Sequence, residues 1–206
     1  LLDRMNVAAV LTVSSIHWFG STLNLIARAN RIPSIVLQHG IIADAHLFCH
    51  LPILATKQAV WGEDTISWYQ RYGVPTSRLS LVGSPRFDII HQQSWPGKVG
   101  LQTKLGIDPE KKILVYATQP LGGAKIRTVA GIVFAGLQAC ADIHLLVMLH
   151  PHERPELYRS LAGNMPNCHI IPFGHLSLYE VLSGADLFIT CFSTAALEAM
   201  LFKVPR

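Results

Sequence analysis

The 206-residue sequence predicts an α/β protein made of two Rossmann-like, doubly wound parallel-sheet halves. Three observations predict this class. Apolar runs of four to eight residues alternate with stretches of helical period, which is typical of repeated βα units. Hydrophobic residues make up 50% of the chain and charged residues only 15%, and the mean hydropathy is +0.33, as expected for strands buried on both faces. The apolar pattern lapses into a polar stretch at 91–112 and then restarts, which indicates two halves.

The first half, residues 1–95, begins with an apolar run at 8–13 that predicts a strand, and apolar positions at helical spacing then predict a helix over 21–30. The apolar run at 35–38 predicts the second strand. The remaining elements of this half are a short strand at 59–61, a helix at 65–72 that Gly73 closes, and a strand at 79–82.

Residues 96–110 are rich in proline and glycine and are predicted to be a linker, so the second half covers residues 111–206. This half restarts with a strand at 113–117. A helix follows with one apolar face, at offsets of four, eight and eleven residues, made of Val129, Val133, Leu137 and Cys140. The remaining elements are strands at 144–149, 169–172 and 186–190 and helices at 156–162, 178–182 and 194–202.

Composition and charge exclude several kinds of protein. The longest charge-free run, 7–27, is interrupted by serine, threonine, histidine, glycine and asparagine, so it is too polar for a helix that crosses a membrane. The 17 Lys and Arg residues are dispersed, so nucleic acid is not a predicted partner. The net charge of +4 suits a small phosphorylated ligand or an anionic membrane surface.

The four cysteines show no CxxC pair and no framework spacing, which predicts reduced thiols and a cytoplasmic location. Peripheral association with the inner face of the cell membrane stays open as a further expectation. The chain begins with Leu1 rather than Met and stops directly after a helical pattern. We therefore expect an internal fragment of a longer protein, truncated at both ends.

The first candidate site residue is His39, in the Gln38-His39-Gly40 sequence that ends the second predicted strand. Ligands of doubly wound folds bind beyond the carboxyl ends of the strands, so this histidine is expected to face the ligand. An imidazole with an ordinary pKa near 6.5 can accept the proton of an attacking hydroxyl near neutral pH. The alternative is a structural histidine that is hydrogen-bonded to a neighbouring loop.

Two loops of the second half are candidates for binding phosphate. In the loop after 113–117, Gly122 and Gly123 would let backbone amides approach a diphosphate, and Lys125 would neutralise it, although a flexible loop is the alternative. In the loop after 144–149, His150 comes directly before Pro151. An imidazole at this edge suits a phosphate or a base edge, and an ordinary helix-entry turn is the alternative.

The third loop, after 186–190, carries Ser193 and Thr194 at the start of a predicted helix. Helix N-termini bind anions because their first amides are unpaired, and the two hydroxyls would add donors to a phosphate. Glu198, one turn further, could hold the two hydroxyls of a ribose. The alternative is plain N-capping by Ser193.

The remaining motifs are weaker evidence about function. His46, Cys49 and His50 have a helical spacing that could place metal ligands on one face, but no fourth ligand is evident, so no metal is predicted. The sequence contains no G-x-S-x-G elbow, no P-loop and no G-x-G-x-x-G motif. Serine hydrolases of the elbow type, ordinary nucleotide hydrolases and dinucleotide enzymes are therefore not predicted, and no cofactor is expected.

Taken together, four segments resemble, in order and spacing, the motifs of GT-B-fold transferases of surface-polysaccharide synthesis: 38–40, 83–88, His150-Pro151 and 193–198. The His-Gly loop and the Gly-x-Pro-Arg-x-Asp motif resemble CDP-glycerol glycerophosphotransferases. The His-Pro and Ser-Thr motifs resemble bacterial sialyltransferases and capsule glycosyltransferases. UDP-N-acetylglucosamine 2-epimerases share the architecture.

The resemblance implies roles for both halves. Residues 1–95 would be the later part of an N-terminal, acceptor-side domain, and residues 111–206 an incomplete C-terminal domain that binds the donor nucleotide. His39 would be the catalytic base. His150, Ser193 and Thr194 would contact the donor phosphates and Glu198 the ribose. Arg86 and Asp88 of the Gly-x-Pro-Arg-x-Asp motif would lie between the domains, within reach of a phosphate.

The expected activity is metal-independent transfer of a sugar from a UDP- or CMP-type nucleotide donor to a hydroxyl of a glycan or lipid-linked acceptor. The sequence departs from the glycerophosphotransferases at 190–194, where they usually carry an Asp and paired serines, and this favours a sugar donor. Polyol-phosphate transfer from a CDP donor and a non-catalytic nucleotide-sugar binding module stay open. The epimerases carry Glu-Ala-Gly where Gln38-His39-Gly40 stands, which makes epimerase chemistry the less favoured alternative.

Overall fold

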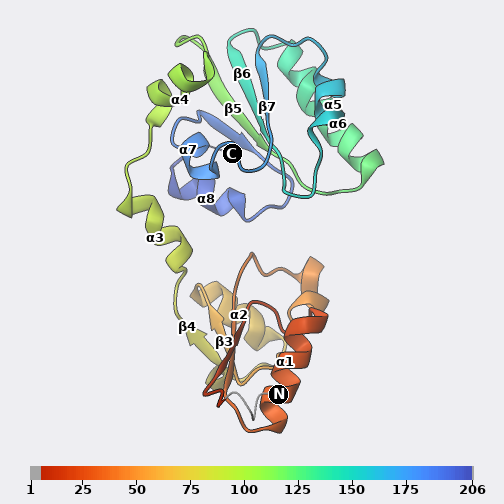
Figure 1. Cartoon of the computed structure of the whole chain (residues 1–206), viewed down its shortest axis with the longest axis vertical. Coiled ribbons are helices and arrows are strands. Elements are labelled where there is room, and N and C mark those ends of the chain that lie inside the picture. Colours follow the sequence, from red (N-terminus) through yellow and green to blue (C-terminus); the bar gives the residue numbers. More distant parts are fainter. Residues whose placement is uncertain (1–5, 206) are drawn as a thin grey trace. The chain divides into compact units, whose positions relative to one another are not determined.

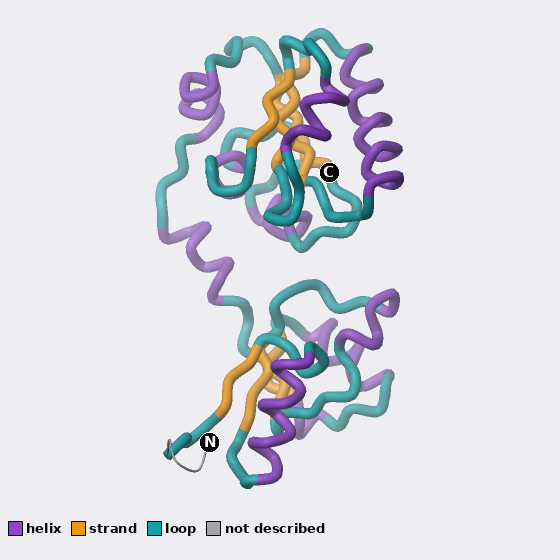
Figure 2. Tube along the Cα trace, turned by 45° about the vertical axis from the view of Figure 1, so that its right-hand side comes forward, coloured by secondary structure: helices purple, strands orange, loops and turns teal. Residues whose placement is uncertain are grey.

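The computed structural model describes residues 6–205, except for the side chain of His46. The chain divides into two compact units, Leu1–Arg86 and Phe87–Arg206 (Figure 1). Each unit contains a parallel four-stranded sheet with helices packed beside it (Figure 2). The predicted class of two parallel-sheet α/β halves is therefore confirmed.

The sheet of the first unit has the strand order β1-β2-β3-β4. Its strands are β1 (Val10–Thr12), β2 (Ser34–Leu37), β3 (Lys57–Val60) and β4 (Leu79–Leu81). Its helices are α1 (Trp18–Ala29) and α2 (Glu63–Arg71), with short 3-10 helices at Asp44–Cys49 and Thr76–Arg78. Because the strands are parallel, their carboxyl ends lie along one edge of the sheet.

The turn between β1 and α1 is fixed by its own residues. Ser14 Oγ accepts hydrogen bonds from the backbone N–H groups of Ile16 (3.3 Å) and His17 (3.1 Å). Gly20 of α1 is buried against this turn, and a Cβ at that position would lie 2.1 Å from the carbonyl oxygen of Ser14. Only glycine therefore lets α1 pack so closely on the carboxyl end of β1.

The main core of the first unit packs α2 on the sheet. Trp68 and Tyr69 of α2 are buried there, with their rings edge to face at a centroid distance of 5.1 Å. The other buried members of this cluster are Val36, Ile53, Ala55, Val60 and Leu79.

The sheet of the second unit has the strand order β7-β6-β5-β8, again with parallel pairing. Its strands are β5 (Lys112–Ala117), β6 (Ile143–Met148), β7 (Cys168–Ile171) and β8 (Leu187–Ile189). After α3 (Pro85–Gln92), which begins at the boundary between the units, its helices are α4 (Gly97–Leu105), α5 (Gly123–Gln138), α6 (Pro155–Ala162), α7 (Leu178–Leu182) and α8 (Ala195–Leu201). No helix within residues 6–205 is long and apolar enough to cross a membrane.

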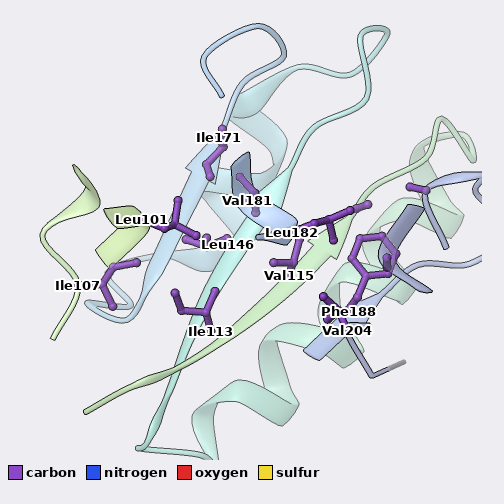
Figure 3. Packing of buried hydrophobic residues seen from close by; sticks show 13 residues of the cluster. Leu101, Ile107, Ile113, Val115, Leu146, Ile171, Val181, Leu182, Phe188 and Val204 are labelled. Atoms are coloured by element: carbon purple, nitrogen blue, oxygen red, sulfur yellow. The ribbon is translucent and has the colours of Figure 1, made fainter. Parts of the chain in front are cut away.

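Both faces of this second sheet are covered. Ile113, Val115 and Ala117 of β5 pack with α4, α7 and α8 on one face (Figure 3). Leu114 and Tyr116, which alternate with them, pack with α5 and α6 on the other face. Successive side chains of a strand point to opposite faces, so a strand covered on both sides must be apolar throughout. This explains the continuous apolar run from which the strand was predicted.

The main differences from the predicted elements lie between the two halves. Residues 97–105, assigned to a linker from the sequence, form helix α4, and the side chain of Leu101 is fully buried in the core of the second unit. Helix α3 was not predicted either. The glycines of this stretch favoured a loop, but Gly106 has φ 66° and is the left-handed C-cap that ends α4.

The buried face of α5 was predicted only in part. Leu137 is buried as expected, whereas Val129 and Val133 are partly buried and flank the cluster. Cys140 lies beyond the end of the helix. The residues at the centre of the face are Ile126, Ala130 and Phe134.

Candidate functional site

The polar loops of the second unit lie at the carboxyl ends of β5, β6 and β8. Two hydrogen bonds connect the ends of β5 and β8. The Phe192 N–H donates to Gln119 Oε1 (2.8 Å), and Thr190 Oγ1 donates to the carbonyl of Ala117 (3.0 Å). The Gln119 side chain is buried and serves as the link. The loops that carry the predicted phosphate ligands after β5 and β8 are thus held together at this edge.

The loop after β6 is held by Thr118, Glu153 and Tyr158. Thr118 Oγ1 accepts a hydrogen bond from the backbone N–H of His150 (3.0 Å) and donates to one carboxylate oxygen of Glu153. The Tyr158 hydroxyl donates to the other carboxylate oxygen (2.6 Å). Burial, followed by the bond to Glu153 and its charge, raises the pKa of Tyr158, so this phenol stays a donor. The network fixes the His150 turn to the end of β5.

His150 is half-buried, and its ring has a defined tautomer. Its Nδ1 accepts a hydrogen bond from the backbone N–H of His152 (3.2 Å). A neutral ring that accepts at Nδ1 carries its proton on Nε2, which leaves Nε2–H as a donor. This is the group that a phosphate oxygen requires.

The two glycines before α5 differ in what they contribute. Gly122 is the N-cap and has φ 85° and ψ 147°, a conformation that favours glycine. Gly123 has no such constraint, and a Cβ there would meet no atom within 4 Å. Both are exposed, as is Lys125 in the first turn of the helix. The unpaired N–H groups at the start of this 16-residue helix lie beside a cationic side chain, which suits an anion.

Ser193 and Thr194 are half-buried at the start of α8. Ser193 Oγ accepts a hydrogen bond from the Ala195 N–H (3.2 Å), which is part of what the capping alternative predicted. An oxygen that accepts this bond still has its O–H as a donor. Thr194 is the N-cap residue, but its side chain makes no capping hydrogen bond.

The Glu198 side chain is buried, whereas the sequence predicted that it would hold the ribose of the ligand. Its side chain is 1% exposed, and Oε1 accepts a hydrogen bond from the Tyr179 hydroxyl of α7 (2.9 Å). Together with Ala195 and Ala199, at helical spacing, it forms the buried face of α8. In this arrangement the carboxylate links α7 to α8 and is not open to a ligand, so its contact with ribose stays a prediction.

His39 belongs to the first unit and follows the carboxyl end of β2. Its ring is exposed, and no hydrogen bond or ion pair involves it within the residues that the structure describes. The Gln38 side chain fixes the turn instead, because Oε1 accepts from the Trp61 N–H (2.8 Å) and Nε2 donates to the Gly40 carbonyl (3.0 Å). A bond from His39 to a neighbouring loop, which the structural alternative predicts, is not found among the described residues, and its role as a base stays a prediction.

The remaining candidates are less informative. Arg86 and Asp88 are exposed on the first turn of α3. Of the residues weighed as metal ligands, the His46 side chain lies outside the described residues, Cys49 is exposed, and His50 packs edge to face on Trp68. Among the other described side chains, no three His, Cys, Asp or Glu residues come together as a metal site.

Several residues of the site were not predicted from the sequence. They hold the predicted ligands in place and are Thr118, Gln119, Glu153 and Tyr158. A signal existed for two of them, because Thr118 and Gln119 come directly after an apolar strand, where polar residues face the ligand edge.

Two parallel-sheet α/β units with polar loops at the carboxyl ends of their strands are the architecture of GT-B-fold proteins. The model of the CDP-Glycerol:Poly(glycerophosphate) glycerophosphotransferase family matches residues 62–206, and the chain belongs to this family. Comparison with curated proteins gave no match.

Solved structures share the fold. The co-structure of S. aureus MnaA with UDP matches with a TM-score of 0.77 and 15% identity over 99% of this chain and 58% of that chain. The UDP-GlcNAc 2-epimerase from Neisseria meningitidis, bound to UDP-GlcNAc, matches with a TM-score of 0.69 and 15% identity, over 91% of this chain and 55% of that one. A glycosyltransferase from Rickettsia africae matches with a TM-score of 0.61 and 12% identity, over 98% of this chain and 57% of that one. The chain therefore spans less than two thirds of the length of these structures.

Proposed function

We propose that the protein containing this chain transfers a polyol phosphate from a CDP-linked donor to a hydroxyl group of a surface polymer. The observation that carries the proposal is the family match over residues 62–206, which includes the whole second unit. The loops at the carboxyl ends of β5, β6 and β8 support it, because they present donors and a cation at the edge where this fold binds ligands.

In this proposal the second unit binds the donor. The Nε2–H of His150, the Lys125 ammonium and the hydroxyls of Ser193 and Thr194 contact the diphosphate. Their task is to stabilise the charge that develops on the leaving phosphate, which is where fixed donors contribute most to rate. The Thr118, Glu153 and Tyr158 network keeps His150 oriented, so little reorganisation is needed when the donor binds.

The first unit provides the base, His39. The acceptor oxygen attacks the β-phosphorus of the donor, the new P–O bond forms as the bond to the α-phosphate oxygen breaks, and CMP leaves. His39 takes the proton of the attacking hydroxyl. Its exposed ring supports this role, because a base must be open to the substrate.

Transfer of a sugar is the second candidate. The sequence at 190–194, which lacks the Asp and paired serines typical of glycerophosphotransferases, favours it. In that case the acceptor oxygen attacks the anomeric carbon and the nucleotide leaves with its phosphate. A glycan or lipid-linked acceptor and peripheral membrane association belong to the same proposal.

The test uses the intact protein with CDP-glycerol, a UDP-sugar and a CMP-sugar. We expect CDP-glycerol to bind most tightly and to be consumed only with an acceptor. Replacement His39→Ala should lower turnover about 100- to 10,000-fold with donor affinity unchanged, whereas His91→Ala, at another exposed histidine, should change neither.

Each other outcome contradicts the proposal in a defined way. Preferred consumption of a UDP- or CMP-sugar would establish the sugar donor. Conversion of a nucleotide sugar without an acceptor would indicate epimerase chemistry. Tight donor binding with no turnover, in the wild type as in the His39 variant, would identify a binding module.

A further inference from the structure

The first unit has a cavity at the carboxyl ends of β1 and β2, beside His39. Its polar lining includes Ser15, Tyr69 and the ring of His50 in addition to His39. The cavity has a volume of about 20 Å³, which is room for one water-sized group. It therefore fits a single hydroxyl group.

Two hydroxyls in its wall make no hydrogen bond to another described residue, and the Ser15 oxygen is fully buried. Ser15 is 3% exposed, and its Oγ makes no hydrogen bond within the described part of the chain. Tyr69 as a whole residue is 1% exposed, and its hydroxyl makes no hydrogen bond in that part of the chain, although the oxygen itself is not among the fully buried atoms. Burial raises the pKa of Tyr69 to about 12, so its hydroxyl is a neutral donor and acceptor. Buried hydroxyls are normally paired, so the unpaired Ser15 Oγ, with the Tyr69 hydroxyl in the same wall, points to a missing hydrogen-bonding group.

The lining determines the chemistry of that group. Among the described residues that line the cavity there is no Lys, Arg, Asp or Glu, so they supply none of the fixed charge that a phosphate or a cation needs. Two hydroxyls that can both donate and accept suit a neutral hydroxyl. His39 is in the same wall, so a group bound here lies next to the proposed base.

We propose that this cavity binds a free hydroxyl of the acceptor, adjacent to the hydroxyl that attacks the donor, and that Ser15 and Tyr69 are its partners. This inference rests on the proposed function, in which the acceptor is a polyol polymer. The terminal unit of such a polymer has two neighbouring hydroxyls. One is positioned by the cavity, and the other is left beside His39.

The test measures equilibrium binding of a glycerol phosphate oligomer of defined length to the intact protein. Replacements Ser15→Ala and Tyr69→Phe each remove one hydroxyl and keep the shape of the wall. Each should weaken oligomer binding about 2- to 10-fold, the range of one ordinary hydrogen bond. Affinity for CDP-glycerol should not change. A second oligomer that ends in propane-1,3-diol lacks the neighbouring hydroxyl, and the same variants should bind it as the wild type does.

Ser34→Ala is the matched control. Ser34 is also buried in the first unit (1% exposed), but its Oγ accepts from the Thr56 N–H (3.1 Å) and it does not line the cavity. This variant should lower the midpoint of urea unfolding and leave oligomer binding unchanged. Ser15→Ala should leave the midpoint equal or higher, because the hydroxyl it removes is unpaired.

Four results would overturn the inference. Oligomer binding could be unchanged in both variants, or weakened equally for the two oligomers. Ser15→Ala could lower the unfolding midpoint as Ser34→Ala does, or the wild type could fail to bind the oligomer. Failure of the proposed function is distinguishable, because it would appear as absent transfer from CDP-glycerol in a protein whose binding of the two oligomers still differs as expected.

Discussion

The pH dependence of stability should be governed by His144 within the core of the second unit. Its side chain is 6% exposed on β6, and Nε2 lies 2.7 Å from Nδ1 of His169 on β7. Burial, followed by the charges of His169 and Lys111, lowers the pKa of His144 from 6.5 to about 4. The folded protein thus holds this ring neutral at pH values where the unfolded chain protonates it.

The sign and size of the change in the free energy of unfolding with pH follow from these two pKa values. Between pH 6.5 and pH 4 the unfolded state binds more protons than the folded state, so the free energy of unfolding falls as the pH is lowered. The full difference between the two pKa values of His144 corresponds to about 3 kcal/mol in the free energy of unfolding. Between pH 7.5 and pH 5, where the folded ring is still largely neutral, the loss attributable to His144 should be about 2 kcal/mol.

The assay is urea unfolding at pH 7.5 and pH 5, followed by hydrogen exchange of peptides that cover β5 and β6, so that the second unit alone is measured. The wild type should lose about 2 kcal/mol more on acidification than the His144→Leu variant, because leucine fills the site without titrating. Groups that do not contact His144 titrate alike in both proteins and cancel in this comparison, and a His169→Leu variant measures the contribution of its partner. An equal loss in the two proteins would refute the reasoning.

Three further predictions concern the donor loops. Gly122→Ala should destabilise the protein by about 1–3 kcal/mol in thermal unfolding, because φ 85° is strained for alanine, whereas Gly123→Ala should be tolerated; equal effects would contradict this assignment. Tyr158→Phe removes a hydrogen bond to the Glu153 carboxylate, so it should cost about 1.5–3 kcal/mol in urea unfolding and should weaken CDP-glycerol binding through the loosened His150 turn. Unchanged donor affinity would show that the network serves stability alone. The double replacement of Ser193 and Thr194 by Ala should weaken donor binding by about 1.5–3 kcal/mol for each bond lost to phosphate. If only the unfolding temperature falls, N-capping is their role.

The strands were predictable because burial on both faces leaves a clear pattern. The strand predicted at 113–117 corresponds to β5, Lys112–Ala117, and the helix predicted at 178–182 coincides with α7. Such runs are short, bounded by turn residues and rich in branched side chains, so a single sequence is enough to find them. The positions of the loops at the strand ends follow from the strands.

Helices without a distinctive polar face were harder to predict. In α5 the apolar residues surround much of the helix, so the set at 129, 133 and 137 and the set at 126, 130 and 134 both fit helical spacing. Only packing against the sheet determines which set is central. The burial of Glu198 could not be predicted from the sequence for a similar reason. Its carboxylate is paired with Tyr179, a partner 19 residues away that helical periodicity cannot identify.

The two units differ in how the polar groups at their strand ends are satisfied, and this difference bears on mechanism. In the second unit Thr118 bonds to Glu153 and to the His150 N–H, and Gln119 accepts from the Phe192 N–H in the loop after β8, so the donor side is organised before any ligand binds. In the first unit the Ser15 hydroxyl is buried without a partner among the described residues and shares a cavity wall with the Tyr69 hydroxyl, although the turn beside them is fixed by Gln38. A fixed set of donors suits the phosphate charge that develops during transfer, because no energy is lost in reorienting them. Unpaired hydroxyls suit a neutral acceptor, because binding it recovers hydrogen bonds that the free protein lacks.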